Sequence, residues 1–325
     1  MDSRQRFVAT MGYGKPDRPP LFEEGIRDGV LEAWRAQGFS QDGLLQDLFD
    51  YDRREEIDLE TRPGLDLVKL AGQRNGLKKL RQRLERSAEG RMPEDWRARL
   101  AGWRERRHVL MLLVHWGFLQ AIGIEDWRSF ARSLYLLADE PDFVRQAMLI
   151  QGELAAGMAD RLLKEVHIDA ALFSEPIGGN HGALVSPRTY RQFALYSYRP
   201  ILEVLKRHGV QIIIWRTYAN ARVLLPAAVE AGINCLWAVE SNPQAMDYRS
   251  IREEFGRDLR LIGGIDLDML RQGREHIRET MERSLPPLLA QGGYIPLADG
   301  RVRPEISFEN YCYYRQLLER LVGGV

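Results

Sequence analysis

The sequence has little of what marks several large classes of protein. It contains only two cysteines, Cys235 and Cys312, which are too few for a disulfide framework and suit a reducing compartment. The start, MDSRQRF, has no apolar signal core, and the longest uninterrupted apolar runs, such as 109–114, are far shorter than a membrane span. We therefore expect a soluble, cytoplasmic protein that does not work on a membrane.

An excess of one charge is also missing, because 46 Lys and Arg residues balance 46 Asp and Glu residues. A neutral chain has no global field that attracts nucleic acid, so no nucleic-acid partner is expected. The chain also lacks a GxGxxG run after a strand, a P-loop, an HExxH motif, an internal repeat and a low-complexity segment. These absences argue against the commonest nucleotide-binding and zinc-protease sites.

What the sequence does contain is a β-loop-α-β pattern over residues 211–240. The apolar run Ile212–Ile214 stops at polar and aromatic residues that include Arg216 and Tyr218, and a second apolar run ends on Glu240. In such units the two strands are parallel, and functional side chains gather on the loops at their C-terminal ends. We therefore expect Arg216, Tyr218 and Glu240 on one rim.

Seven segments of the chain have the pattern of strands, and helix-length segments separate most of them. Repeated βα units without a nucleotide fingerprint predict an α/β fold, a (β/α)8 TIM barrel with extra N-terminal and inserted helices, rather than an open sheet. An eighth strand is expected between Ile57 and Lys69. The seven segments lie near Leu21, Val109, Ile168, Ile212, Ile233, Leu259 and Tyr294.

We expect a single barrel domain over residues 1–325 with a charged helical insertion at about 70–107. Residues 74–107 carry twelve Lys or Arg against five acids, which is typical of a solvated face; a docking surface for an acidic partner or a polyanion is the alternative. Pro141 and the Ser186-Pro187 and Ser307 caps mark helix starts. Helices are expected at 4–13, 29–50 (two), 75–107 (a pair), 125–137, 141–165, 186–208, 274–291 and 307–321.

Ten polar residues follow the predicted strands and form the candidate site. An arginine beside a tyrosine can bind a carboxylate and donate a proton, and histidine is the side chain whose ordinary pKa lies near neutrality. Taken singly, each could instead form a loop salt bridge or a cap. The candidate catalytic residues are Tyr218, His181, Asp299 and Glu175, and the candidate substrate-binding residues are Arg27, Arg216, Glu23, Asn180, Glu240 and Asp266.

Four ordered segments resemble the uroporphyrinogen decarboxylase superfamily. They are GKPDRPPLFEEG, the SEP…HGALVSPRTYRQF stretch, RLIGGID, and GGYIPLADGRVRPEISFENYCYYR near the C-terminus. The resemblance covers the first 40 residues and nearly everything after Glu125. It implies a TIM barrel with the active site at the C-terminal ends of its strands. It also implies either decarboxylation of porphyrinogen acetate groups without a cofactor, or methyl transfer between corrinoid proteins and thiols with zinc.

The chain departs from both branches of that superfamily. The resemblance puts Arg216 and Tyr218 where the methyltransferases have a His-x-Cys zinc motif, so no metal site is expected. It also leaves Arg27 as the remnant of an Arg-rich N-terminal loop, and Gly300 where the decarboxylases have a histidine. A substrate with eight carboxylates would need several cations there.

We therefore expect a uroporphyrinogen decarboxylase-like enzyme, a lyase that acts on a carboxylated small molecule, tetrapyrrole-like or smaller. Its chemistry would be acid/base, most simply decarboxylation, and it would need no cofactor. One alternative is a methyltransferase that works with a corrinoid carried by a partner protein or with another methyl carrier. A second is a catalytically idle barrel kept as a binding subunit. The sequence leaves open whether the chain forms a homodimer.

Overall fold

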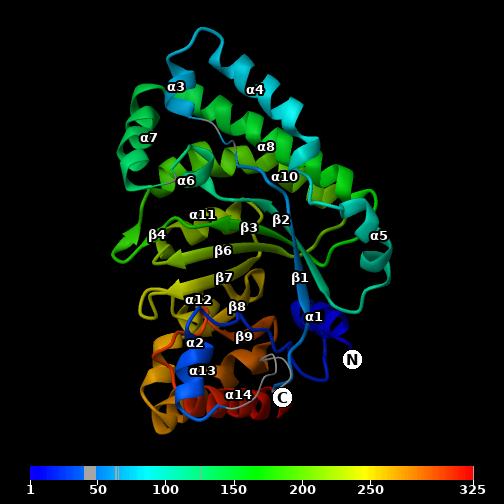
Figure 1. Ribbon diagram of the computed structural model, residues 1–325, viewed down its shortest axis with the longest axis vertical. Helices are drawn as coiled ribbons and strands as arrows, with labels where there is room; N and C mark the ends of the chain where they lie inside the picture. Colours follow the sequence, from blue (N-terminus) through cyan, green and yellow to red (C-terminus); the bar gives the residue numbers. More distant parts are fainter. Residues whose placement is uncertain (40–48, 63, 65, 125, 325) are drawn as a thin grey trace. The chain divides into compact units, whose positions relative to one another are not determined.

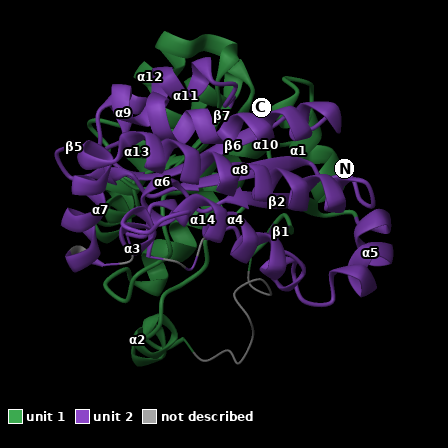
Figure 2. Cartoon of the chain, turned by 90° about the horizontal axis from the view of Figure 1, so that it is seen from above, with its two compact units in different colours: residues 1–54, 107–109, 235–325 green, residues 55–106, 110–234 purple. Residues whose placement is uncertain are grey.

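The computed structural model describes residues 1–39, 49–62, 64, 66–124 and 126–324. These residues form two compact units, coloured in Figure 2. Unit 1 consists of residues 1–54, 107–109 and 235–325, and unit 2 of residues 55–106 and 110–234. None of the described helices is long and apolar enough to cross a membrane. The single domain over 1–325 remains a prediction.

Unit 2 is built on strands in the order β1, β2, β3 and β6, of which β2–β3 and β3–β6 are paired in parallel. All seven residues of β2 are buried, as its continuous apolar sequence predicts. A short antiparallel hairpin, β4 with β5, follows β3. The bounds are β1 (Arg54–Asp58), β2 (Val109–His115), β3 (Ala170–Glu175), β4 (Gly178–Gly179), β5 (Gly182–Ala183) and β6 (Ile213–Ala219).

Helices alternate with these strands. The longest, α8, packs against both α4 and α10, as Figure 1 shows. A π-helical segment, η3, interrupts the long helix that begins at the Ser186 cap, so this helix is divided into α9, η3 and α10. The bounds are α3 (Leu67–Ala71), α4 (Gly76–Ser87), η2 (Glu89–Arg91), α5 (Trp96–Glu105), α6 (Phe118–Ala121), α7 (Trp127–Asp139), α8 (Pro141–Leu163), α9 (Pro187–Thr189), η3 (Tyr190–Leu195), α10 (Tyr196–Arg207), η4 (Arg222–Leu224) and α11 (Leu225–Glu230).

The charged segment at 70–107 is largely helical, and its residues up to Arg106 belong to unit 2. Its helix α4 buries Leu80 and Leu84 on one face and exposes most of its charged residues. Part of its basic surplus is paired with α8, for example through Arg81 and Glu153 at 2.8 Å. The segment is therefore attached by both an apolar face and ion pairs.

Unit 1 contains β7, β8 and β9 in that order, with both neighbouring pairs parallel. Its closing helix α14 starts at the Ser307 cap and packs against α13, whose bounds match the expected helix. The bounds are α1 (Ser3–Met11), α2 (Val30–Ala36), β7 (Cys235–Ser241), α12 (Tyr248–Phe255), η5 (Gly256–Asp258), β8 (Arg260–Ile265), η6 (Leu267–Arg271), α13 (Arg274–Gln291), β9 (Tyr294–Ala298) and α14 (Phe308–Gly323).

Two expected strands are corrected. The segment at Leu21 is buried but forms no strand, because the Leu21 N–H and carbonyl bond to the Asp52 side chain and N–H rather than to a ladder. The strand expected between Ile57 and Lys69 is β1, which ends at Asp58, and the following residues 67–71 are helical. The acidic composition of β1 hid it, since only Ile57 of its five residues is fully buried.

The remaining expectations agree in type with the described elements. The second helix expected within 29–50 falls mostly on residues 40–48, which lie outside the described residues. Both units are α/β with parallel strands between helices, as predicted. Closure into an eight-stranded barrel remains a prediction.

Candidate functional site

Arg216 and Tyr218 lie on the last half of β6 in unit 2. Side chains alternate along a strand, so these two share a face while Thr217 between them is buried on the other. The Arg216 Nη1 atom lies 3.0 Å from both carboxylate oxygens of Glu56 on β1. This pair is largely shielded from solvent, with exposed fractions of 14% for Arg216 and 25% for Glu56.

Glu175 ends β3 and is completely buried. Its Oε1 accepts from the Phe118 N–H at 2.8 Å, and its Oε2 accepts from the hydroxyls of Tyr190, at 3.2 Å, and of Tyr198. Burial raises the pKa of Glu175 to about 7, against the opposing effect of these three hydrogen bonds. The carboxyl group can therefore change its protonation state near neutrality.

Gly117 makes the contact between Glu175 and α6 geometrically possible. Its φ of +93° suits glycine, and a Cβ there would lie 2.5 Å from the Ser174 carbonyl oxygen and 2.9 Å from Glu175 Oε1. Any side chain at this position would push Glu175 away from the start of α6.

Asn180 and His181 form the tip of the β4–β5 hairpin, and both are exposed. The hairpin is held to the end of β6 by a backbone hydrogen bond from the Asn220 N–H to the Gly179 carbonyl, at 3.1 Å. His181 is therefore exposed on a loop near the end of β6, whereas Glu175 is buried and bonded to two tyrosine hydroxyls.

In unit 1, Glu240 is the second-last residue of β7, has a φ of +43° and forms an ion pair with Arg27. Both partners are open to solvent, with exposed fractions of 40% for Arg27 and 43% for Glu240. Arg303 approaches the same carboxylate at 4.0 Å. Within the described residues, the Nε atoms of Arg27 and Arg303 are buried without a hydrogen-bond partner, so both guanidinium groups retain bonding capacity. A Cβ on Gly300 would lie 3.2 Å from Glu240 Cγ.

Two predicted residues of unit 1 form local structural bonds. Asp299 is buried and accepts from the Ser241 N–H and hydroxyl at 2.9 and 2.7 Å and from the Leu267 N–H at 3.0 Å. Burial raises its pKa. Asp266 caps η6 by accepting from the Asp268 N–H at 2.9 Å. Their predicted roles in catalysis and substrate binding remain predictions.

Glu23, also in unit 1, is buried beside Arg315, whose Nη1 lies 3.3 Å from Glu23 Oε2. The Tyr311 hydroxyl lies 3.3 Å from the same oxygen. Burial raises the pKa of Glu23 to about 7, while Arg315 opposes the rise. Thus the Glu23 carboxyl group is shielded from solvent, with 7% of its side chain exposed.

The structure adds neighbours that sequence reasoning missed, among them Glu56, Asp58 and Trp116 in unit 2. Glu56 and Asp58 alternate along β1, and Asp58 Oδ1 accepts from the Trp116 indole N–H at 3.0 Å. The signal available was the alternation in REEID, which was hidden because most of its residues are charged. Arg303 and Arg315 were missed because they lie in a loop and a helix, not directly after a strand.

The residues present do not fit the zinc that the methyltransferase branch would require. A guanidinium and a phenol occupy positions 216 and 218 and are not ordinary zinc ligands. Across the described parts of the chain, no three His, Cys, Asp or Glu side chains gather into a group that could hold a metal ion.

Comparisons with known proteins identify the family. A xylanase B structure from Clostridium stercorarium F9 is similar at 9% identity with a TM-score of 0.38, over 84% of this chain and 88% of that chain. No curated protein sequence matches this chain. The family model of uroporphyrinogen decarboxylase (URO-D) matches residues 125–314, which is more than half of the chain. The chain therefore belongs to the uroporphyrinogen decarboxylase family.

Proposed function

We propose that this family member is an enzyme that decarboxylates a carboxylated small molecule by acid/base chemistry, without a cofactor. The observation that carries the proposal is the shielded pair between Arg216 and Glu56 beside Tyr218. Glu56 occupies the guanidinium as a substrate carboxylate would. Charge-assisted contacts of this kind contribute about 1.5–3 kcal/mol to binding.

The chemistry restricts which carboxylate Arg216 holds. An arginine bound to the carboxylate that leaves would stabilise the substrate more than the transition state, in which charge moves onto carbon. We therefore assign Arg216 to a carboxylate that remains on the product, so the substrate carries at least two. The bond from the leaving carboxylate to carbon breaks, its electron pair stays on carbon, and CO2 departs.

The carbanion then takes a proton from Tyr218 or His181, and water restores the donor. Tyr218 shares the face of β6 with Arg216, which favours it for this step. Glu175, with a pKa of about 7, remains a candidate proton reservoir through Tyr190 and Tyr198.

The experiment begins with the purified full chain. Native mass spectrometry identifies a retained small molecule, and membrane-inlet mass spectrometry measures CO2 release from it and from a panel of di- and tricarboxylates. We expect stoichiometric CO2 release from at least one compound. If none releases CO2 at enzyme concentrations of about 100 μM, the decarboxylase proposal fails.

Methyl transfer with a corrinoid-carrying partner protein is the alternative that family membership also supports. This alternative predicts that the chain removes the methyl group from added methylcobalamin when a methyl acceptor is present. The change in cobalamin absorbance measures the reaction. A chain that neither releases CO2 nor demethylates methylcobalamin would favour a non-catalytic binding subunit.

A further inference from the structure

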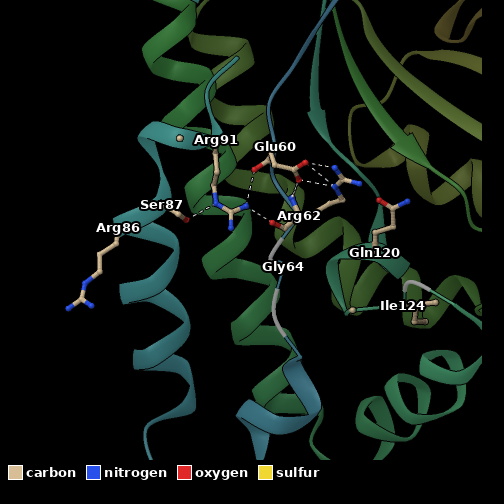
Figure 3. A pocket seen from close by; sticks show the side chains of 10 residues that line it. Glu60, Arg62, Gly64, Arg86, Ser87, Arg91, Gln120 and Ile124 are labelled. Atoms are coloured by element: carbon tan, nitrogen blue, oxygen red, sulfur yellow. Dashed lines mark hydrogen bonds and ion pairs between the residues drawn. The ribbon is translucent and has the colours of Figure 1, made fainter. Parts of the chain in front are cut away.

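A cavity of about 850 Å³ opens in unit 2 between the loop after β1, the end of α4 with η2, and α6. Its volume lies in the range of small-molecule sites. Figure 3 shows Arg91, Glu60 and Arg62 directed toward one another on its wall, with Gln120 beyond Arg62 and Arg86 turned away from them. The cavity shares no lining residue with the Arg216 site.

Arg91 is fixed in the cavity wall by hydrogen bonds to three oxygen atoms of the chain. Its Nε donates to the Ser87 hydroxyl at 2.7 Å, and its Nη1 donates to the carbonyl oxygens of Glu60, at 3.0 Å, and of Arg62. These bonds orient the guanidinium, and the nearby Glu60 carboxylate attracts its charge. Arg91 is therefore a preorganised cation that shares the Glu60 carboxylate with Arg62 on this wall.

Arg62 already binds a carboxylate of the chain itself, that of Glu60. Its Nε lies 2.8 and 3.2 Å from the two carboxylate oxygens of Glu60, and its Nη2 also bonds to Glu60. The hydrogen bond from Arg62 lowers the pKa of Glu60. The pair is exposed by 48% and 40%, so an exchange of Glu60 for another oxyanion is sterically open.

Two residues beside these arginines, Trp116 and Gln120, could help to recognise a ligand. The Arg62 guanidinium lies over the Trp116 ring, 4.7 Å from its centroid. Among the described residues, the buried Oε1 atom of Gln120 has no hydrogen-bond partner, and such an atom favours a ligand that brings a donor. The wall thus presents two guanidinium groups and an unsatisfied amide.

We propose that this cavity binds a small oxyanion, a carboxylate or phosphate that also carries a hydroxyl or amide donor. The oxyanion displaces Glu60 from Arg62 and is held between Arg62 and Arg91, while its donor bonds to Gln120. The proposal does not rest on the reaction proposed for the Arg216 site, so failure of the CO2 assays leaves it standing.

Isothermal titration calorimetry of the full chain with citrate and with glycerol 3-phosphate, which both carry a hydroxyl group, in low-salt HEPES, tests the proposal. We expect a dissociation constant below about 1 mM for at least one of them; citrate alone would identify a carboxylate site and glycerol 3-phosphate alone a phosphate site. Arg62→Gln should weaken binding about tenfold or more. Glu60→Gln should strengthen it about threefold or more, because the competing anion is gone.

Lys78→Gln is the matched control, since it removes one charge from the exposed side of α4 outside the cavity lining and should change binding less than about twofold. A second readout is Trp116 fluorescence, which should change with ligand in the parent and not in Trp116→Phe. A dissociation constant above about 1 mM for both probes overturns the proposal. So does a shift of the same sign for Arg62→Gln and Glu60→Gln in variants with unchanged thermal melts.

Discussion

Each unit places an arginine–glutamate pair at the end of a strand, but the two pairs differ in their solvent exposure. Arg216 and Glu56 in unit 2 are exposed by 14% and 25%, whereas Arg27 and Glu240 in unit 1 are exposed by 40% and 43%. Exposed ion pairs contribute about 0–1 kcal/mol and are screened by salt, while shielded charges interact more strongly. The same residue types therefore suit different roles, and burial favours Arg216 as the anchor.

The buried acids extend this comparison. Glu23 in unit 1 faces a buried arginine, whereas Glu175 in unit 2 accepts from an amide and two phenols, all neutral. Burial raises the pKa of both carboxyls to about 7. Glu175 on β3 pairs in register with Thr217, the residue next to Arg216 on β6, so its protonation can be tested together with that site.

The largest expected effect is the pH dependence of stability that Glu175 contributes. Its pKa is about 7 in the folded chain against an ordinary 4.5, so the folded state keeps the proton that the unfolded chain has lost. The contribution is complete below pH 4.5 and is lost as the pH rises through about 7, by up to about 3 kcal/mol in total.

Glu175→Gln should remove this loss of stability with rising pH. Urea unfolding at steps of about half a pH unit measures the free energy of unfolding. Glu203→Gln on α10 controls for the loss of an exposed carboxylate. Equal pH slopes for the parent and Glu175→Gln would show that burial of Glu175 does not store this energy.

Next in size is the effect of Tyr218 on turnover. If its phenol is the proton donor, Tyr218→Phe should lower kcat about 100-fold and leave the dissociation constant nearly unchanged. Steady-state rates and calorimetry with the identified substrate separate the two quantities. Tyr135→Phe, at an exposed site in the same unit, is the control. Undiminished turnover in Tyr218→Phe would transfer the role to His181.

A smaller effect distinguishes the two arginines. Arg216→Lys keeps the charge but loses the planar fork, so binding of a carboxylate ligand should weaken about tenfold or more. Arg27→Lys, in the exposed pair, should weaken it less than about threefold. Titration of both variants with the same ligand compares them directly, and a larger loss at Arg27 would reverse the assignment.

The smallest effect is expected for the coupling between Arg27 and Glu240. A double-mutant cycle with Arg27→Ala and Glu240→Ala should give less than about 1 kcal/mol in the free energy of unfolding, falling further in 0.5 M salt. The corresponding cycle for Arg216 and Glu56 should exceed it. A coupling of about 2 kcal/mol or more at Arg27 would show that solvent exposure does not predict the strength of this ion pair.

Much of the fold follows from local patterns in the chain. The local sequence predicted three features correctly. They are the continuous apolar run that forms β2, the proline and serine at the starts of α8 and α9, and the bounds of α13. β1 and the segment at Leu21 were not, because an acidic strand carries little apolar signal and a side chain can take the backbone bonds of a would-be strand.

The sequence by itself determined the α/β class, the order of most elements and which polar residues follow strands, because these depend on residues that are close together in the chain. Only the tertiary structure decided that Arg216 bonds to Glu56, that Glu175 is enclosed by two tyrosines, and that Arg62 lies between Glu60 and Trp116. Exposure and charge pairing depend on contacts between segments that are far apart in the sequence. The electrostatic interaction energy of a charged side chain distinguishes a functional charge from an ordinary salt bridge. This energy depends on those contacts.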